Sequence, residues 1–475
     1  MRSAHRPEDA GGRLRSNANL KFPTAKAPRT PWLMAEWKGT NGTSEDPKSA
    51  FSDPPVWSRK NRILGGPWRH GGSKFFSGEG KNTMITRAQE ITGWVQAHEG
   101  EALAFLEALV NQDSGTHDRV EVNRVGDVLA AAYAGLGFSV KRISQSQYGN
   151  HLLASHGSMG EGRRLLCVGH MDTVFSAGAA KSRPFRVEGN RATGPGVLDM
   201  KGGLTLLLFA LRALAETESA AWRGMGVSVL VNSDEEIGSP TSGGLIADLA
   251  ERHDAAIVME PARPSGECVI ARKGVGHFRV EVFGRQAHAG SQPELGISAI
   301  WELAHKVCAL QALNDLGRGT TVNVGVIRGG ERSNVVPDYA CADVDLRIWN
   351  LDEGNRILRA FDEIVGRSTV PGTTGKLSGE ISTPPWQTND GTRRMLTLLQ
   401  QAGGALGIAI HGVATGGGSD GSRTAQHVPT LDGLGPVGSR THSPEEFMEV
   451  PSLRERTALL ALFIEKWYEA FATSR

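Results

Sequence analysis

Histidine and carboxylate side chains recur at the ends of short apolar runs in the middle of the chain. His170 and Asp172 follow the run RLLCVG. Glu235 and Glu236 follow VSVLVNS, and Glu260 ends AAIVME. Each run has the length and composition of a buried strand, and ligands bind at the carboxyl ends of strands in an open α/β sheet. We therefore expect these side chains to meet at one edge of a sheet.

Two further side chains can reach the same edge. Asp199 precedes a predicted helix with two glycines in its first turn, and His442 comes after the strand-like segment TLDGLG. Imidazole and carboxylate groups are ligands of zinc and related divalent ions. A single carboxylate at a strand end is usually a turn residue, but buried, mutually repelling carboxylates need cations nearby. The repeated placement therefore favours a two-metal site over a set of unrelated turns.

Helices and strands alternate around these residues. The apolar runs are the predicted strands, and MKGGLTLLLFALRAL (200–214) is a predicted helix. Such alternation indicates an α/β domain with a mostly parallel sheet flanked by helices. A predicted helix over 391–406 and a predicted strand over 430–435 return the chain to this domain. We assign it to residues 84–270 and 381–475.

Residues 271–380 follow a different order. FRVEVFG alternates as a half-exposed strand should, and it precedes a predicted helix over 294–313. Strands over 320–327 and 339–349, a helix over 352–365 and a strand over 376–382 complete the segment. The order β-α-β-β-α-β is the split βαβ pattern. We predict an inserted ferredoxin-like domain over 271–380 that serves as a lid and a dimerisation surface.

The first 83 residues differ from the rest of the chain. They hold 15 Lys/Arg and 7 Asp/Glu, a net charge of +8, and 8 of the 22 prolines. No helical or strand period persists there, which is typical of disorder. Met84 opens a helical pattern that runs to Val110. We predict a disordered extension over 1–83 and a working protein that begins near Met84, which N-terminal sequencing of the native protein would test.

Composition excludes several other classes of function. Lys+Arg number 52 and Asp+Glu 51, so the chain as a whole carries no polyanion-binding signal. No run approaches the roughly 18 apolar residues of a membrane span, and the N-terminus lacks the apolar region of a secretory signal. The four cysteines form no CxxC pair, which favours buried, reduced thiols. We predict a cytoplasmic protein with neither nucleic acid nor membrane as a partner.

Taken in order, the motifs resemble the two-zinc metallopeptidases that include glutamate carboxypeptidase, aminoacylase, succinyl-diaminopimelate desuccinylase and acetylornithine deacetylase. The resemblance covers about 84–475, and the run over 284–300 is most similar to the glutamate carboxypeptidase branch. The matching segments are GHMDTV (169–174), GPGVLDMKGG (194–203), NSDEEIGS (232–239), MEPA (259–262), GRQAHAGSQPELGISAI (284–300), SNVVP (333–337), DVDLR (343–347), GGGSDG (416–421) and THSPEEF (441–447).

The resemblance implies how the metals are held. His170 and Glu260 would bind one metal ion, and Glu236 and His442 would bind the other. Asp199 would bridge the two ions. Two Zn²⁺ are the implied cofactors, with Co²⁺ or Mn²⁺ as substitutes.

The resemblance also implies catalytic roles. Asp172 would orient the ring of His170, and Glu235 would be the general base. His288 would reach the active site of the partner subunit and stabilise the oxyanion. The substrate-binding residues implied are Asn334, Arg347, Gly417, Gly418 and Ser419, the last three for the substrate carboxylate.

The expected function is hydrolysis of an amide or peptide bond next to a free carboxylate, of the carboxypeptidase or dipeptidase type. A metal-bridging hydroxide would attack with Glu235 as its base, the substrate would be a small peptide or N-acyl amino acid, and the protein would be a homodimer. One alternative is a deacylase or deacetylase of N-acyl amino acids, and another is a catalytically silent peptide- or metal-binding homologue. The segment GEISTPPW (379–386) lacks the arginine that glutamate carboxypeptidases carry there, so the preferred C-terminal residue is left open.

Overall fold

The computed structural model describes residues 78–158 and 163–472. Residues 1–77 of the extension predicted over 1–83 therefore lie outside the described residues. Helix α1 (Gly78–Ala97) already covers residues 78–83, so the predicted disorder is wrong for that stretch. Extending a formed helix costs far less than nucleating one, so a helix can run past its apolar pattern. The pattern that runs on to Val110 is divided at His98, after which α2 (Glu99–Val110) begins.

A six-stranded sheet forms the centre of the α/β part, in the order β1-β2-β6-β3-β7-β16. The β6–β3, β3–β7 and β7–β16 pairs are parallel, whereas β1–β2 and β2–β6 are antiparallel. The sheet is thus mixed, with three of its five strand pairs parallel, and β2 runs opposite to the other strands because the short link after β1 allows only a hairpin. The strands span β1 (Ser139–Ile143), β2 (His151–His156), β3 (Arg163–His170), β6 (Met225–Asn232), β7 (Ala255–Val258) and β16 (Thr430–Leu431).

The predicted strand over 430–435 is shorter than expected. Hydrogen-bonded pairing with β7 ends at Leu431, and Gly433 has φ +68°, which leaves the extended conformation. Beyond this turn the chain stays beside the end of β7, because the N–H groups of Leu434 and Gly435 donate to the carbonyl oxygens of Val258 and Glu260.

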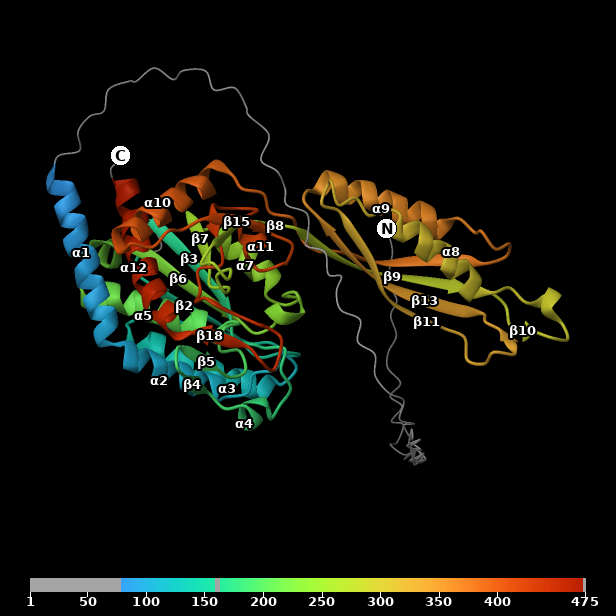
Figure 1. Ribbon diagram of the computed structural model, residues 1–475, viewed down its shortest axis with the longest axis horizontal. Helices are drawn as coiled ribbons and strands as arrows, with labels where there is room; N and C mark the ends of the chain where they lie inside the picture. The colour runs from blue at the N-terminus through green and yellow to red at the C-terminus, as the bar shows by residue number, and fades with distance from the viewer. Residues whose placement is uncertain (1–77, 159–162, 473–475) are drawn as a thin grey trace, which may run out of the picture. The chain divides into compact units, whose positions relative to one another are not determined.

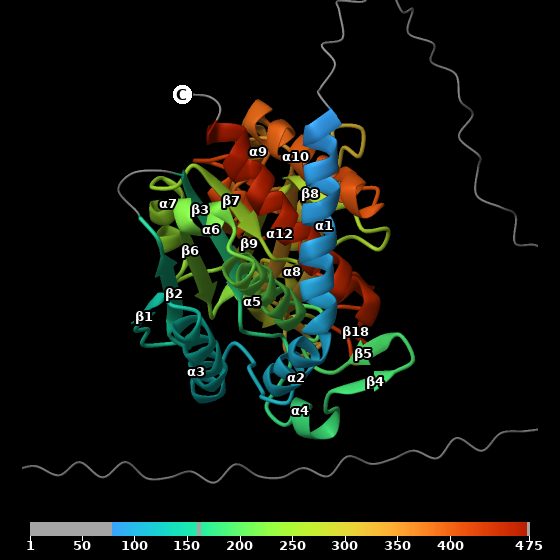
Figure 2. The ribbon, with the colours of Figure 1, turned by 90° about the vertical axis from the view of Figure 1, so that its left-hand side faces the viewer.

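Helices cover both faces of this sheet. Leu165 and Cys167 of β3 belong to a core that they share with the helix α5 (Lys201–Glu216), while Leu166 and Val168 pack with the helix α7 (Gly243–Ala250). This division follows from the alternation of side chains along a strand. Helix α5 is buried on nearly every side because α12 (Val450–Ala472), α1 and α2 also pack on it (Figure 2).

Shorter elements complete this part of the chain. Helices α3 (Arg119–Gly135) and α10 (Asp390–Leu406) also pack on the sheet strands, and β8 (Cys268–Arg272) pairs in parallel with β15 (Gly412–Thr415). The remaining elements are α4 (Ala179–Ser182), β4 (Arg186–Glu188), β5 (Arg191–Thr193), α6 (Ala220–Gly224), α11 (Gly421–Thr424), β17 (Gly438–Ser439) and β18 (Phe447–Glu449).

A second, four-stranded sheet is built from the middle of the chain (Figure 1). Its order is β11-β13-β9-β14, and every neighbouring pair is antiparallel. Two helices pack on it through a core of its own. The chain order β9-α8-β11-β13-α9-β14 is the predicted β-α-β-β-α-β pattern. Its elements span β9 (Gly274–Phe283), α8 (Ala299–Gln311), β11 (Thr321–Gly329), β13 (Tyr339–Ile348), α9 (Leu351–Gly366) and β14 (Thr374–Thr383).

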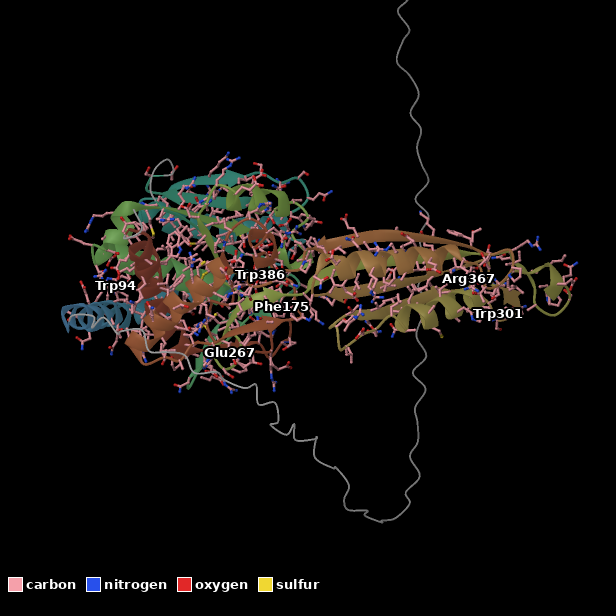
Figure 3. All side chains as sticks on the ribbon, turned by 90° about the horizontal axis from the view of Figure 1, so that it is seen from above. Trp94, Phe175, Glu267, Trp301, Arg367 and Trp386 are labelled. Atoms are coloured by element: carbon pink, nitrogen blue, oxygen red, sulfur yellow. The ribbon has the colours of Figure 1, made fainter. Side chains whose placement is uncertain are left out.

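Helix α8 starts later than the predicted 294–313. Residues Pro293–Leu295 form a separate 3-10 turn, and the side chain of Ser298 then caps the helix by accepting the N–H of Trp301. Trp301 on α8 is 61% exposed (Figure 3). The assignment of 271–380 to a separate inserted domain stays a prediction.

Two compositional expectations have structural counterparts. Cys167, Cys268 and Cys341 are buried free thiols, whereas Cys308 on α8 is exposed, which corrects the expectation that the thiols are buried. None of the described helices is long and apolar enough to cross a membrane.

Candidate metal centre

The predicted ligands converge on one edge of the six-stranded sheet. His170 ends β3, and Glu260 lies two residues beyond the end of β7. Glu236 sits in the 3-10 turn η1 (Glu235–Ile237) that follows β6. Asp199 lies directly before α5, and His442 lies in the loop between β17 and β18. Because β6, β3 and β7 are adjacent and parallel, their carboxyl ends bring these groups together, as the sequence predicts (Figure 1).

Asp199 stands between the two histidines. Its Oδ1 is 3.2 Å from Nε2 of His170, and its Oδ2 is 3.3 Å from Nε2 of His442. Glu260 Oε1 is 3.8 Å from the same His170 nitrogen. Glu236 Oε2 is 3.1 Å from the same His442 nitrogen. Each histidine nitrogen therefore faces Asp199 and one glutamate, so the two groups of possible ligands share the Asp199 carboxylate.

These separations fit shared metal ions. Tetrahedral zinc with ligand bonds of about 2.0–2.2 Å places two ligand atoms roughly 3.3–3.6 Å apart. The four distances, 3.1–3.8 Å, bracket that value. Grouping by mutual distance also yields a set of His170, Glu235 and Glu260 within 4.8 Å, so Glu235 is near enough to compete as a ligand. The donor types and spacing suit two divalent cations, with Asp199 between them.

The carboxylates repel one another without cations. Burial, reinforced by the charge of Asp199, raises the pKa of Glu260 to about 8. Burial and neighbouring carboxylates also raise the pKa of Glu235 well above its usual range, and burial raises that of Glu236. Asp199 differs: although burial opposes ionisation, hydrogen bonds from His170 and His442 lower its pKa. A metal-free centre thus retains protons that bound cations would displace.

The pKa values of His170 and His442 are both raised. Burial works against protonation of His170, but hydrogen bonds to Asp172 and Asp199 raise its pKa well above the usual value. Hydrogen bonds to Asp199 and Glu236 raise the pKa of His442 to about 10. Protons on these rings therefore take the place that cations would hold between the carboxylates.

Asp172 has more partners than the sequence indicates. His170 Nδ1 lies 3.5 Å from Asp172 Oδ1 and 3.0 Å from its backbone oxygen, consistent with an orienting role. The carboxylate also accepts the hydroxyl of Thr116 at 2.8 Å. It further accepts the backbone N–H groups of Glu235 and Glu236, each at 3.3 Å. Asp172 therefore holds both a ligand ring and the turn that carries two functional glutamates.

A cavity of about 390 Å³ opens over this centre. Its lining includes Glu235, Glu236 and His442 together with the guanidinium groups of Arg347 and Arg423. A larger cavity of about 740 Å³ lies between α1, α10 and α12, and none of the predicted site residues lines it. The smaller cavity is the one that adjoins the chemistry.

The two arginines of the smaller cavity are held differently. Arg347 forms a two-pronged ion pair with Asp345, at 2.8 and 2.9 Å. Arg423, which the sequence reasoning missed, donates to the backbone oxygens of Gly238 and Ser382. Ser382 belongs to the GEISTPPW segment, so a guanidinium from elsewhere in the chain reaches the stretch that lacks an arginine of its own. Its only sequence signal was its place just after GGGSDG.

The predicted carboxylate-binding loop is only partly directed at the cavity. Gly418 and Ser419 line the cavity, whereas Gly417 does not. The Ser419 hydroxyl donates to Asp432 at 2.5 Å and accepts the N–H of Gly421 at 3.0 Å. The carbonyl oxygens of Gly417 and Gly418 accept Nη1 of the buried Arg272, which also pairs with Asp432 at 2.7 Å. These contacts fix the loop, and they already occupy the Ser419 hydroxyl with hydrogen bonds to Asp432 and Gly421.

His288 and Asn334 lie elsewhere, on the short ribbon of β10 (Ala287–His288) and β12 (Val335–Val336). Both side chains are exposed. His288 Nδ1 accepts two N–H groups of the following turn, and the Asn334 carbonyl accepts the N–H of Ala289. Within residues 78–158 and 163–472 of this one chain, no hydrogen bond or ion pair joins either residue to the metal centre.

Glu446 is a further residue that the sequence reasoning missed. Its side chain is buried and accepts the backbone N–H groups of Gly196, Leu198 and Asp199. Burial raises its pKa to about 7. The signal available in the sequence was a second acidic residue in THSPEEF, four positions after His442.

Comparisons with known proteins are consistent with this geometry. Residues 166–466 match the model of the Peptidase family M20/M25/M40. Carboxypeptidase G2 of Pseudomonas sp. (strain RS-16) is 30% identical over 369 residues, which cover 76% of this chain and 87% of that protein.

Solved structures have the same fold. The aminopeptidase PepT from Bacillus cereus ATCC 10987 superposes with a TM-score of 0.66 at 22% identity, covering 78% of this chain and 98% of that one. The YXEP protein of Bacillus subtilis, described as a dinuclear metal binding peptidase, gives 0.59 at 16% identity, covering 79% and 99%. At these identities the structures establish the fold alone. The family match and the carboxypeptidase relative establish that this chain belongs to the M20/M25/M40 peptidase family, whose members act on peptide or amide bonds.

Proposed function

We propose that this protein is a metal-dependent hydrolase that cleaves an amide or peptide bond next to a free carboxylate, in the manner of a carboxypeptidase or dipeptidase. One observation carries the proposal. Asp199 faces His170 with one oxygen and His442 with the other, beneath a cavity that two arginines line. A shared carboxylate suits two cations, and guanidinium groups suit an anionic substrate. The similarity to a carboxypeptidase supports the same class.

The cofactors we propose are two Zn²⁺, for which Co²⁺ or Mn²⁺ could substitute. His170 and Glu260 would hold one ion, and Glu236 and His442 would hold the other. Asp199 would be a ligand of both ions. When bound, such cations polarise the scissile carbonyl and make an attacking water more acidic. Asp172 keeps the His170 ring in the orientation in which Nε2 faces the site.

Glu235 is the proposed general base. It follows β6, it is adjacent to a ligand, and its backbone is held by Asp172. It would take the proton from the attacking water and pass it to the leaving amine. Burial in the metal-free state raises its pKa, and the charge of bound cations would lower it toward the range in which a carboxylate can both accept and return a proton.

The substrate carboxylate would lie in the cavity beside Arg347 and the 417–419 loop. The segment 271–380 would act as a lid that closes over the substrate and places Arg347 and Asn334. His288 of the partner subunit would stabilise the oxyanion.

A homodimer through the second sheet is supported by exposed apolar groups on α8 and on the edge strand β11. On α8, Trp301 is 61% and its sequence neighbour Ile300 43% exposed, and on β11 Ile327 is 57% exposed. Apolar groups on an edge strand favour pairing with another chain.

Hydrolysis of a panel of dipeptides and N-acyl amino acids tests the function. The C-terminal residue would be varied to include glutamate, since the source of side-chain selectivity is open. Each substrate would be tested with zinc, cobalt or manganese and again after chelation. We expect metal-dependent release of one class of amino acid. Turnover of N-acyl substrates without any dipeptide would instead favour a deacylase, and two bound metals without any turnover would favour a silent binding protein.

A further inference from the structure

Glu446 lies under the metal centre without belonging to the ligand set. Its side chain is 1% exposed, and a buried carboxylate is costly unless its oxygens are hydrogen-bonded. Oε1 accepts the N–H groups of Leu198 and Asp199 at 2.8 and 2.9 Å. Oε2 accepts the N–H of Gly196 at 3.1 Å. Both oxygens therefore serve the backbone that leads into the shared ligand Asp199.

The segment 196–199 depends on these bonds. It consists of turns between β5 and α5, so no neighbouring strand supplies acceptors for its N–H groups. Glu446 lies 247 residues away from Asp199 in the chain. The Glu446 side chain therefore accepts the hydrogen bonds that a neighbouring strand would otherwise accept. It fixes the backbone position from which the Asp199 side chain extends.

The same residue closes the turn that carries His442. The N–H of Glu446 donates to the carbonyl of Ser443 at 3.1 Å. Arg440 and His442 both have φ +62°, a left-handed conformation that is strained for residues other than glycine and persists only where surrounding contacts hold it. The anchored Glu446 side chain ties the end of this turn to the Asp199 loop.

We propose that Glu446 is a positioning residue that keeps the Asp199 and His442 loops at the spacing needed to bind the second metal ion. The inference rests on the metal centre proposed above. Of the ligands of that ion, Asp199 and His442 both depend on Glu446. The other ion shares only Asp199 with that site, and its other ligands, His170 and Glu260, are fixed by the ends of β3 and β7. Loss of Glu446 should therefore weaken the two sites unequally.

Glu446→Gln is the test variant, with Glu445→Gln as its matched control. The amide keeps the size of the side chain, but its NH₂ group must face at least one backbone N–H where an acceptor stood. Glu445 is adjacent and exposed. Replacing its carboxylate makes the same chemical change at the adjacent position and leaves the three backbone bonds intact.

The experiment measures metal binding by the full chain after chelation. Zn²⁺ would be titrated calorimetrically, Co²⁺ would be followed by its visible absorption, and unfolding of the metal-free proteins would be recorded. We expect two ions per chain for the wild type and for Glu445→Gln. For Glu446→Gln we expect one ion bound with a small loss of affinity, because it shares only Asp199 with the other site, and a second bound roughly 10–100-fold more weakly. Saturating metal should then restore the second ion.

Equal affinities for two ions in the wild type and Glu446→Gln would overturn the inference. Glu446→Asp keeps the charge but shortens the reach, so we expect an intermediate loss of affinity. If both variants lose the metal-free fold, Glu446 is a general structural residue and the inference is overturned. A wild type that binds no metal would overturn the proposed function itself, and this inference with it.

Discussion

The metal centre and the β10–β12 ribbon are prepared for function in different ways. At the centre, His170, Asp172 and Asp199 are buried, and each contacts groups from distant parts of the chain. On the ribbon, His288 is exposed, and its ring nitrogen bonds only to the turn that directly follows it. Tertiary contacts hold the three side chains of the metal centre in place, whereas the contacts of the His288 ring are local.

This difference indicates what completes each part. The proposed metal ligands already lie within range of shared cations, so binding of metal alone should complete the centre. His288, in the oxyanion-stabilising role proposed for it, would need a substrate-induced movement or a second copy of the chain to reach the chemistry. Variants at the centre should therefore act within one chain, whereas a variant at His288 should be rescued by another.

The largest effect is expected at the centre. Glu235→Gln should lower kcat by about 10²–10⁴-fold, the contribution of a positioned general base, while both metal ions stay bound. Steady-state kinetics combined with metal analysis measures both quantities. Glu236→Gln is the matched neighbour and should lose metal. If Glu235→Gln also lost a metal ion, Glu235 would be a ligand of the set that contains His170 and Glu260.

A smaller effect is expected on the ribbon. His288→Ala should lower kcat by about 10²–10³-fold, the usual cost of one oxyanion donor, with metal content and thermal stability unchanged. Co-expression of His288→Ala with Glu235→Gln should restore part of the activity, because a mixed dimer contains one site with both groups intact. Activity no higher than that of the separate variants would place His288 in its own chain's site or outside catalysis.

The smallest expected effect is a pH dependence of stability that arises at the metal centre. Burial raises the pKa of Glu260 to about 8, and hydrogen bonds to Asp199 and Glu236 raise that of His442 to about 10. Their unfolded values are about 4.3 and 6.5. Groups with raised folded pKa values add stability that is complete below the unfolded values and is lost as the pH rises through the folded ones.

The Tm of the metal-free protein should therefore fall between about pH 4.3, where the Glu260 contribution begins to be lost, and about pH 10, where that of His442 is gone. The metal-loaded protein should fall less, because cations rather than protons then hold the carboxylates apart. Calorimetry of both forms across this range is the measurement. A metal-free Tm that rises over the same range would contradict the protonation pattern of the centre.

The sequence was sufficient to predict which side chains meet at the centre. The apolar runs before His170, Glu235 and Glu260 have the length of buried strands, and adjacent parallel strands share a carboxyl edge. The order of elements over 274–383 was also predictable, because alternating and helical periods are local properties.

The partners of those side chains were not predictable. The bonds from Asp172 to the Glu235–Glu236 turn, from Glu446 to the Asp199 loop and from Arg423 to Ser382 join segments 41 to 247 residues apart. The reversed strand, β2, was also not predicted within the mostly parallel sheet. Periodicity fixes which face of an element is apolar. Only the folded chain decides which distant backbone N–H groups a buried carboxylate must satisfy, because that depends on where the loops lie in space.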